Sequence, residues 1–432
     1  MQALLIFVIF FIFVFATVPI GISIGLAIIL YAAVTGNINF NYIATGMFTS
    51  CDSFPLMAIP FFVLGGALME GGGLSKRLVG FFDTIVGHLT GGLAIVTVVA
   101  CMFFGAISGS APATVAAIGT IMVPTMIEKG YDKKWSMALV AASGCLGTII
   151  PPSIPMVMYG VATGASISTM FMGGFLPGIV CGLTLIVIAV IYCHKNGYHG
   201  NGLKFSFRRI WDSFKDAVWA LLVPVIILGG IYGGFFTPTE AAVVSVVYGL
   251  LVGLFIYKEL DFKKICQKLA DSANTSATIL IIVGTGTVLG RVLTIEQVPQ
   301  TVAAMMGGIT ESKIVILLIM NLLLIVVGCL METTSAILIL APILYPVAAA
   351  FGVDIIHFGI MMVVNLSIGF ITPPVGVNLF VASGIGGIPF VDLCKKIIPF
   401  LIALLVGLLL ITYIQDIVLM IPKLGGYVPT GM

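Results

Sequence analysis

Residues 144–153 read Gly-Cys-Leu-Gly-Thr-Ile-Ile-Pro-Pro-Ser, and residues 368–376 read Ile-Gly-Phe-Ile-Thr-Pro-Pro-Val-Gly, with the two Pro pairs 222 positions apart. Each Pro pair removes two backbone donors and disfavours helical dihedral angles in the residue before it, so a helix cannot continue through either stretch. Unpaired backbone groups are costly in hydrocarbon, so such breaks occur in membrane proteins only where they are buried or line an aqueous cavity. We therefore interpret both breaks as parts of a binding site built from one unit used twice.

The composition indicates an all-α polytopic membrane protein. Of 432 residues, 60% are hydrophobic and 8% are charged, and long apolar runs recur from end to end. The first residues, Met-Gln-Ala, carry no basic segment, so we expect the first apolar run to be retained as a span surrounded by lipid. The eight cysteines show no C-x-x-C spacing, which argues against a zinc site or a redox motif. We expect no organic cofactor and no nucleic-acid partner.

The two breaks belong to a longer internal repeat. We predict a first repeat over 1–200, a basic cytoplasmic linker over 201–216, a second repeat over 217–419 and a tail over 420–432. Each repeat is expected to contain one re-entrant helical hairpin, whose small polar tip is unsuited to a surface loop, and one discontinuous helix. The hairpins are predicted at about 91–128 and 314–350, and the broken helices at 135–160 and 358–382. Residues 3–33 are interpreted as two short helices, with one kinked helix as the alternative.

Charge placement predicts that the two repeats are inverted relative to each other. Five crossings in each half, an odd number, place the second repeat upside down in the membrane. With the N-terminus outside, 16 of the 19 basic residues fall in loops on one side. Since Lys and Arg concentrate in cytoplasmic loops, that side is expected to be cytoplasmic.

Four motifs together resemble the large membrane subunit of tripartite ATP-independent periplasmic (TRAP) transporters over nearly the whole chain. They are Ser-Gly-Ser-x-x-Ala-Thr at 108–114, Pro-Pro-Ser at 151–153 followed by Tyr159-Gly160, Phe-Thr-Pro-Thr-Glu-Ala-Ala at 236–242, and Asn365 with Gly-x-x-Thr-Pro-Pro-Val-Gly at 369–376. The resemblance implies a sodium-coupled importer of organic acids such as C4-dicarboxylates or sialic acid, located in the bacterial inner membrane and working by an elevator motion. It also implies two partners, a small four-helix membrane subunit and a periplasmic substrate-binding protein.

The residue chemistry of the tips and breaks agrees with that implication. Discontinuous helices place half-helix N-termini toward anions and unwound carbonyls toward Na⁺. We expect each hairpin tip to face the break of its own repeat, forming one sodium site per repeat. The first site is predicted to comprise Ser108, Gly109, Ser110, Thr114, Gly144, Gly147 and Thr148, and the second Glu332, Thr333, Thr334, Ser335, Asn365, Gly369 and Thr372. The alternative is that these small residues only permit close helix packing.

Ionisable groups inside apolar spans are rare and often functional, which draws attention to Arg291 and Glu332. For Arg291 we weigh a structural ion pair or snorkelling against capture of a substrate carboxylate by its planar guanidinium, and favour a cavity-facing side chain. The substrate set is predicted to be Arg291, Glu332, Pro152, Ser153 and Pro373. For Glu240, which follows Thr-Pro-Thr, we predict a helix capping box.

Two other functional classes stay open at this level. An intramembrane enzyme would need a nucleophile with a base or a metal-ligand cluster, and no span shows such spacing. A channel or a binding-protein-independent sodium/dicarboxylate symporter would share the inverted hairpins. Substrate identity is beyond the sequence.

Overall fold

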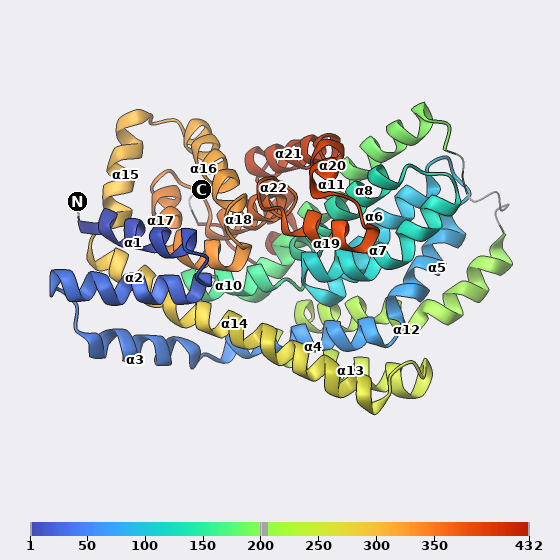
Figure 1. Ribbon diagram of the computed structural model, residues 1–432, viewed down its shortest axis with the longest axis horizontal. Helices are drawn as coiled ribbons and strands as arrows, with labels where there is room; N and C mark the ends of the chain where they lie inside the picture. Colours follow the sequence, from blue (N-terminus) through green and yellow to red (C-terminus); the bar gives the residue numbers. More distant parts are fainter. Residues whose placement is uncertain (1, 199, 201–205, 431–432) are drawn as a thin grey trace.

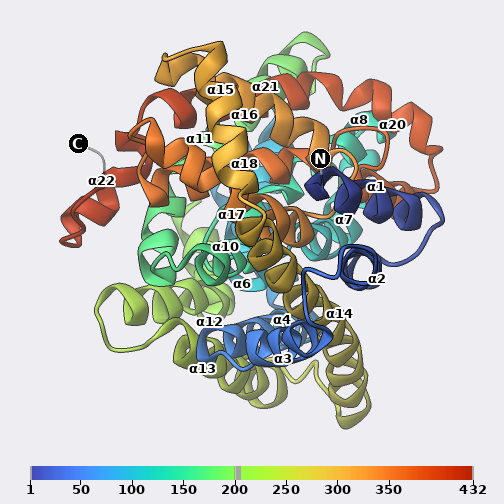
Figure 2. The ribbon, with the colours of Figure 1, turned by 90° about the vertical axis from the view of Figure 1, so that its left-hand side faces the viewer.

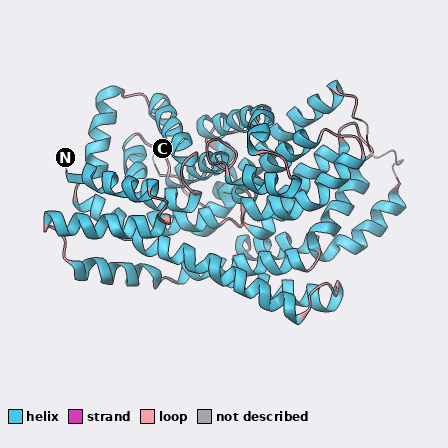
Figure 3. Cartoon of the chain, viewed as in Figure 1, coloured by secondary structure: helices cyan, strands magenta, loops and turns pink. Residues whose placement is uncertain are grey.

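The computed structural model describes residues 2–198, 200 and 206–430. Within those ranges the chain consists of helices joined by loops, with no strand (Figure 3). Seven of the described helices are long and apolar enough to cross a membrane, or up to ten if each bent pair counts as one span. The all-α membrane fold predicted from composition is therefore confirmed.

The helices of the first half are α1 (Gln2–Phe15), α2 (Ile20–Thr35), α3 (Phe40–Cys51), the short 3-10 turn η1 (Phe54–Met57), α4 (Ala58–Gly71), α5 (Leu74–Val86), α6 (Gly92–Ser108), α7 (Ala111–Glu128), α8 (Lys133–Gly144), α9 (Leu146–Ile149), α10 (Ile154–Thr163) and α11 (Ile167–Lys195). Those of the second half are α12 (Phe207–Tyr232), α13 (Pro238–Leu251), the π-helical turn η2 (Val252–Ile256), α14 (Phe262–Ile295), α15 (Val298–Ile309), α16 (Lys313–Gly328), α17 (Thr333–Ala350), α18 (Ile355–Gly369), α19 (Val377–Gly386), α20 (Phe390–Lys396), α21 (Ile398–Tyr413) and α22 (Asp416–Leu424).

Both halves contain the predicted hairpin and broken helix. The hairpins are α6–α7 and α16–α17, and they enter the molecule from opposite ends (Figure 1). The broken helices are α8–α9–α10, bent by 40° at its break, and α18–α19. The repeated plan, with its two halves approaching from opposite sides, agrees with the inverted-repeat fold class.

Several boundaries differ from the sequence-based prediction. Helix α12 begins at Phe207, inside the predicted linker, because the aromatic side chain of Phe214 packs on Phe81 of α5, with ring centroids 6.0 Å apart. Helix α22 crosses the predicted start of the tail and buries Val418 and Leu419. Helices α1 and α2 are separate and pack together, which confirms the two-helix interpretation.

The capping box predicted at Glu240 is also confirmed. The Glu240 carboxylate accepts the Thr237 backbone N–H at 2.8 Å, and the Thr237 hydroxyl accepts the Glu240 N–H at 3.3 Å. Residue 240 therefore serves to start α13.

The basic loops meet on one side of the molecule, as the charge pattern predicts. Arg77 contacts Glu259 at 2.6 Å and Asp216 at 3.4 Å, which joins three of these loops. Lys134 contacts Asp392 at 2.8 Å, which joins two more. We call this the basic side and the opposite one the outer side.

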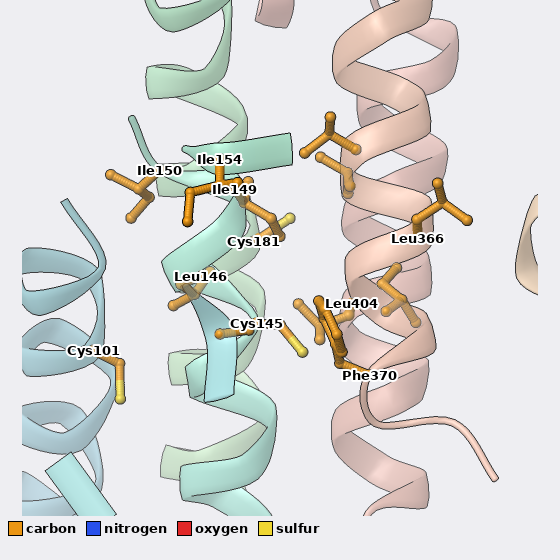
Figure 4. Packing of buried hydrophobic residues seen from close by; sticks show 14 of the residues in the cluster. Cys101, Cys145, Leu146, Ile149, Ile150, Ile154, Cys181, Leu366, Phe370 and Leu404 are labelled. Atoms are coloured by element: carbon orange, nitrogen blue, oxygen red, sulfur yellow. The ribbon is translucent and has the colours of Figure 1, made fainter. Parts of the chain in front are cut away.

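Two groups of helices pack against each other around the breaks. On one side α14 crosses α2, α3 and α4, while α4 packs on α13 and α5 packs on α12 (Figures 1 and 2). On the other side lie the hairpins, the broken helices, α11 and α21, where Leu146 and Ile149 of α9 lie near Cys181 of α11 (Figure 4). Their buried apolar residues are continuous with those of α4, α5, α12, α13 and α14. The wall formed by α2, α3, α4, α13 and α14 is called the scaffold below, and the second group is called the core.

Candidate functional site

The tip of the first hairpin is a short turn of hydroxyls and carbonyls. Gly109 adopts the left-handed conformation (φ +61°) that ends α6, and its N–H donates to the Gly105 carbonyl at 2.9 Å. The Thr114 hydroxyl donates to the Ser110 carbonyl at 2.8 Å and lies 3.0 Å from the Ser108 hydroxyl. The tip thus offers several neutral oxygens within one turn and no charged side chain.

The first break packs directly on this tip. A Cβ atom added to Gly147 would collide with the Thr114 hydroxyl and lie 2.7 Å from the Ser110 carbonyl oxygen, so the observed packing requires glycine. The Ser153 hydroxyl donates to the Thr148 carbonyl at 2.5 Å, which closes the unwound segment on itself. Gly144 faces α7 and α19 instead of the tip hydroxyls. The structure therefore brings together most, though not all, of the residues predicted for the first sodium site.

Glu332 caps the N-terminus of α17 in the second hairpin. Its carboxylate accepts the N–H groups of Thr334 and Ser335 at 3.1 and 3.2 Å and also accepts their hydroxyl groups. Thr333 reaches the second broken helix, where its hydroxyl donates to the Leu366 carbonyl at 3.3 Å. One carboxylate oxygen of Glu332 is thus occupied in starting the helix.

Asn365 anchors the second broken helix to the second hairpin. Its side-chain NH₂ donates to the backbone carbonyl and the side-chain oxygen of Asn321 at 3.0 and 2.8 Å. The Asn365 side-chain oxygen is buried and has no hydrogen-bond partner among the described residues. Gly369 lies against Gly328 without room for a side chain, and the Thr372 hydroxyl donates to the Ile368 carbonyl at 2.8 Å.

The two broken helices are joined by polar contacts that the sequence did not single out. The hydroxyls of Thr148 and Ser367 lie 2.8 Å apart, and Asn378 of α19 donates to the Ala141 carbonyl of α8 at 3.1 Å. A signal for this network exists in the sequence, because Asn321 and Asn378 are amides placed within otherwise apolar helices. Their partners could not be read from the chain, since the contacts span more than 200 residues for Asn378.

The two breaks differ in exposure. Pro151 and Pro152 are buried, whereas Pro373 and Pro374 are exposed. The Pro151–Pro152 and Pro373–Pro374 bonds are both cis. In this conformation the second break is therefore the more accessible of the two.

Both tips and both breaks line one cavity of about 460 Å³ between the scaffold and the core. The starts of four helices meet there, namely those of α7, α10, α17 and α19, and α14 supplies the scaffold wall. The lining residues are Ile20, Gly109, Ser110, Ala111, Pro112, Thr148, Ile154, Pro155, Thr275, Thr278, Ile279, Ile282, Glu332, Thr334, Ser335, Phe370 and Val377. Helix N-termini carry positive partial charge, so those of α7, α10 and α19 suit an anion in this cavity, called the tip cavity below, whereas the Glu332 carboxylate already occupies the N-terminus of α17.

The predicted substrate residues are not assembled at one place. Glu332 lines the tip cavity, but Arg291 lines a separate cavity of about 400 Å³, so the idea that these two side chains share a site is wrong. The reason is distance along α14, whose residues 275–282 face the tip cavity while Arg291 lies near its outer end. Pro152 and Ser153 are buried, Pro373 is exposed, and none of the three lines the tip cavity.

Comparisons with known proteins agree with this geometry. Residues 7–417 match the family model described as "Tripartite ATP-independent periplasmic transporter, DctM component". The chain is 40% identical to the C4-dicarboxylate TRAP transporter large permease protein DctM of Rhodobacter capsulatus, covering 99% of this chain and 100% of that protein. It is 38% identical to the sialic acid TRAP transporter large permease protein SiaM of Vibrio cholerae, covering 95% and 96% of the two chains.

One further relative and one solved structure add to the comparison. The chain is 48% identical to the isethionate TRAP transporter permease protein DctMQ of Oleidesulfovibrio alaskensis over 94% of its own length, and it spans 64% of that longer protein. A crystal structure of the Alcanivorax borkumensis YdaH transporter shares the fold with a TM-score of 0.63, at 15% identity, over 87% of this chain and 88% of that one.

The relatives that carry functional names are transporter permeases and not enzymes. The family model and the relatives cover almost the entire chain, including both hairpins and both breaks. The chain therefore belongs to the tripartite ATP-independent periplasmic transporter family as its DctM component, a multi-pass protein of the bacterial inner membrane.

Proposed function

We propose that this protein imports an organic anion by sodium-coupled secondary transport, with the tip cavity as the substrate site. The observation that carries the proposal is the convergence of two hairpin tips, two breaks and four helix N-termini on one cavity of about 460 Å³. Inverted-repeat transporters with discontinuous helices bind substrate and coupling ions at such a point.

The anion class follows from the chemistry of the cavity wall. The N-termini of α7, α10 and α19 direct positive partial charge at the same space, whereas Glu332 caps α17 and adds one negative charge that a bound Na⁺ would offset. The relatives are named for C4-dicarboxylate, sialic acid and isethionate, which are all organic anions. We propose that the substrate is a carboxylate or sulfonate of this kind.

Sodium is proposed as the coupling ion because each tip and break offers neutral oxygens. At the second break the buried side-chain oxygen of Asn365 lacks a hydrogen-bond partner among the described residues, as expected for an atom that can bind a cation. At the equivalent position of the first repeat, the buried Ser143 hydroxyl likewise lacks a partner. The ligands would come from the hydroxyls and carbonyls at 108–114 and 147–148 for one ion, and at 332–335 and 365–372 for the other.

The elevator motion is proposed from the division of the molecule into scaffold and core. The hairpins and broken helices that hold the cavity belong to the core, while α14 forms the opposing wall. Movement of the core along α14 would carry the cavity between the outer and basic sides without dismantling it. Membership of the family implies a small membrane subunit and a periplasmic binding protein as partners.

Reconstitution tests the proposal. Proteoliposomes containing this chain, the small subunit and the external binding protein should accumulate succinate, N-acetylneuraminate or isethionate when Na⁺ is outside. Replacing the Na⁺ gradient by an equal K⁺ gradient should abolish accumulation. Equal uptake with K⁺ would contradict sodium coupling, and uptake that needs no binding protein would favour an independent symporter.

A further inference from the structure

A second cavity lies on the outer half of the interface between scaffold and core. Its volume is about 400 Å³, and it lies between α3, α10, α14 and α17. It contains Tyr42 of α3 and Thr287, Arg291 and Thr294 of α14, and none of its lining residues belongs to the tip cavity. Arg291 lies four residues from the end of α14 at Ile295, opposite the basic side from which that helix starts.

Two polar groups of this outer cavity, on Arg291 and Thr287, lack partners among the described residues, whereas the Thr294 hydroxyl donates to the Gly290 carbonyl at 2.8 Å. Among the described residues, Arg291 makes no salt bridge, and no acidic residue lines the cavity. The Thr287 hydroxyl oxygen is buried and has no hydrogen-bond partner within the described chain. An unpaired guanidinium and a buried hydroxyl thus share one cavity with a formal charge of +1 from its side chains.

Close helix packing holds the guanidinium at this place. A Cβ added to Gly46 of α3 would lie 3.7 Å from an Arg291 guanidinium nitrogen, so the side chain extends along α3. On the other side, Gly290 lies against Pro342 of α17, which brings the core close to α14. The arginine is therefore positioned where scaffold and core meet.

We propose that the outer cavity is a reception site, where Arg291 and Thr287 bind the carboxylate or sulfonate of the substrate before it enters the tip cavity. This inference rests on the proposed function. A guanidinium presents paired donors that match a carboxylate or sulfonate, and Thr287 adds a hydroxyl donor. The Arg291 side chain is exposed at the mouth of the cavity, where it can meet an incoming anion, and the buried Thr287 hydroxyl, without a partner among the described residues, favours a ligand that supplies an acceptor oxygen.

Helix α14 connects the two cavities. Ile282 lines the tip cavity and Thr287 lines the outer cavity, and five residues of helix separate them by about 7.5 Å. The two cavities are therefore close along one helix, and passage of the anion from the reception site to the tip cavity past the contact of Gly286 with Leu338 is part of the proposal. The reception site lacks the tip oxygens proposed for Na⁺, so its anion binding should not require sodium.

An equilibrium binding measurement tests this difference. Purified protein in sodium-free choline buffer is heated with choline succinate, N-acetylneuraminate or isethionate, with choline chloride at equal ionic strength as the reference. The anion that is transported should raise the unfolding temperature, and Arg291→Gln should abolish that rise. Lys423→Gln, which removes one outer-side charge elsewhere, should retain it.

Transport kinetics of two more conservative variants give a second test, which stays informative even if Arg291→Gln does not fold. Arg291→Lys and Thr287→Val should each raise the KM for substrate, by about tenfold for the arginine change, as expected for loss of a hydrogen bond to a charged group. Their half-saturating Na⁺ concentration should match that of the wild type. Sodium dependence absent from wild-type uptake would count against the proposed function alone.

Three results would overturn the reception site. They are the absence of sodium-independent stabilisation of the wild type, stabilisation that persists in Arg291→Gln, and an unchanged KM in both conservative variants when wild-type uptake depends on Na⁺. The same measurement with phosphatidylglycerol tests whether the acceptor oxygens come from a lipid headgroup. If Arg291→Gln lost stabilisation by phosphatidylglycerol but kept that by the free anions, the cavity would hold a lipid headgroup instead.

Discussion

Substituting Gly147 by alanine tests the contact between the first tip and the first break. The added methyl carbon would lie 2.7 Å from the Ser110 carbonyl oxygen, 0.7 Å short of the 3.4 Å at which ordinary contact begins. The methyl would also meet the Thr114 hydroxyl; rotation of Thr114 could relieve that contact, but the Ser110 carbonyl is backbone and cannot rotate away. Overpacking of this kind costs about 1–3 kcal/mol and should push the tip away from the break.

Two measurements follow from that displacement. The free energy of unfolding of Gly147→Ala, from denaturant titration in detergent, should fall by about 1–3 kcal/mol. The Na⁺ concentration for half-maximal uptake should rise about tenfold, since 1.4 kcal/mol of lost ion-site stability corresponds to that factor. If the ion site lies elsewhere, only the stability should change.

Gly229→Ala is the matched control. Gly229 lies within α12, and a Cβ added there would have no atom within 4 Å. Its replacement should stabilise the protein by about 0.5–1 kcal/mol through helix propensity, with unchanged sodium dependence. If Gly147→Ala behaved like this control in both assays, the tight contact between tip and break would be refuted.

Further substitutions probe the tips and the basic side. Ser110→Ala and Thr372→Ala should each raise the half-saturating Na⁺ concentration in proteoliposome uptake without loss of folded protein, and unchanged values in both would assign these residues to packing alone. Glu332→Ala should lower thermal stability by about 0.5–2 kcal/mol through loss of the α17 cap, whereas Glu332→Gln should lose less because its oxygen still accepts; equal losses would argue against capping. Arg77→Gln should destabilise the basic side, where the guanidinium contacts Glu259 at 2.6 Å, and the effect should shrink in high salt; a salt-independent loss would point to packing.

The repeat, its hairpins and its breaks could be predicted because their signals are local. A Pro pair ends a helix wherever it occurs. A small polar tip such as Ser108-Gly-Ser110 between two apolar arms indicates a re-entrant hairpin whose tip is buried in protein. The start of α12 was missed because its charged residues resemble a loop, although its aromatic side chains pack on α5. Amphipathic segments of this kind are decided by tertiary contacts that a single sequence does not display.

In the candidate site, too, features with a local sequence signal could be predicted and features set by tertiary contacts could not. The approach of Gly147 to the first tip could be predicted, because the first break contains two glycines and the first tip, Ser108-Gly-Ser110, has only small residues. The separation of Arg291 from Glu332 could not be predicted. Both residues lie in or beside apolar helices, and only the structure shows that they line different cavities. The capping role of Glu332 had a sequence signal, an acid directly before Thr-Thr-Ser at a helix start, which was interpreted as ion chemistry.

The ratio of Na⁺ to substrate moved per transport cycle tests the central claim most directly. Parallel uptake of ²²Na⁺ and labelled substrate into proteoliposomes, measured at the initial rate with the binding protein present, provides this ratio. Because each repeat contributes one tip and one break, the account predicts at least two Na⁺ per substrate. A ratio of one, or substrate uptake without Na⁺ movement, would contradict it.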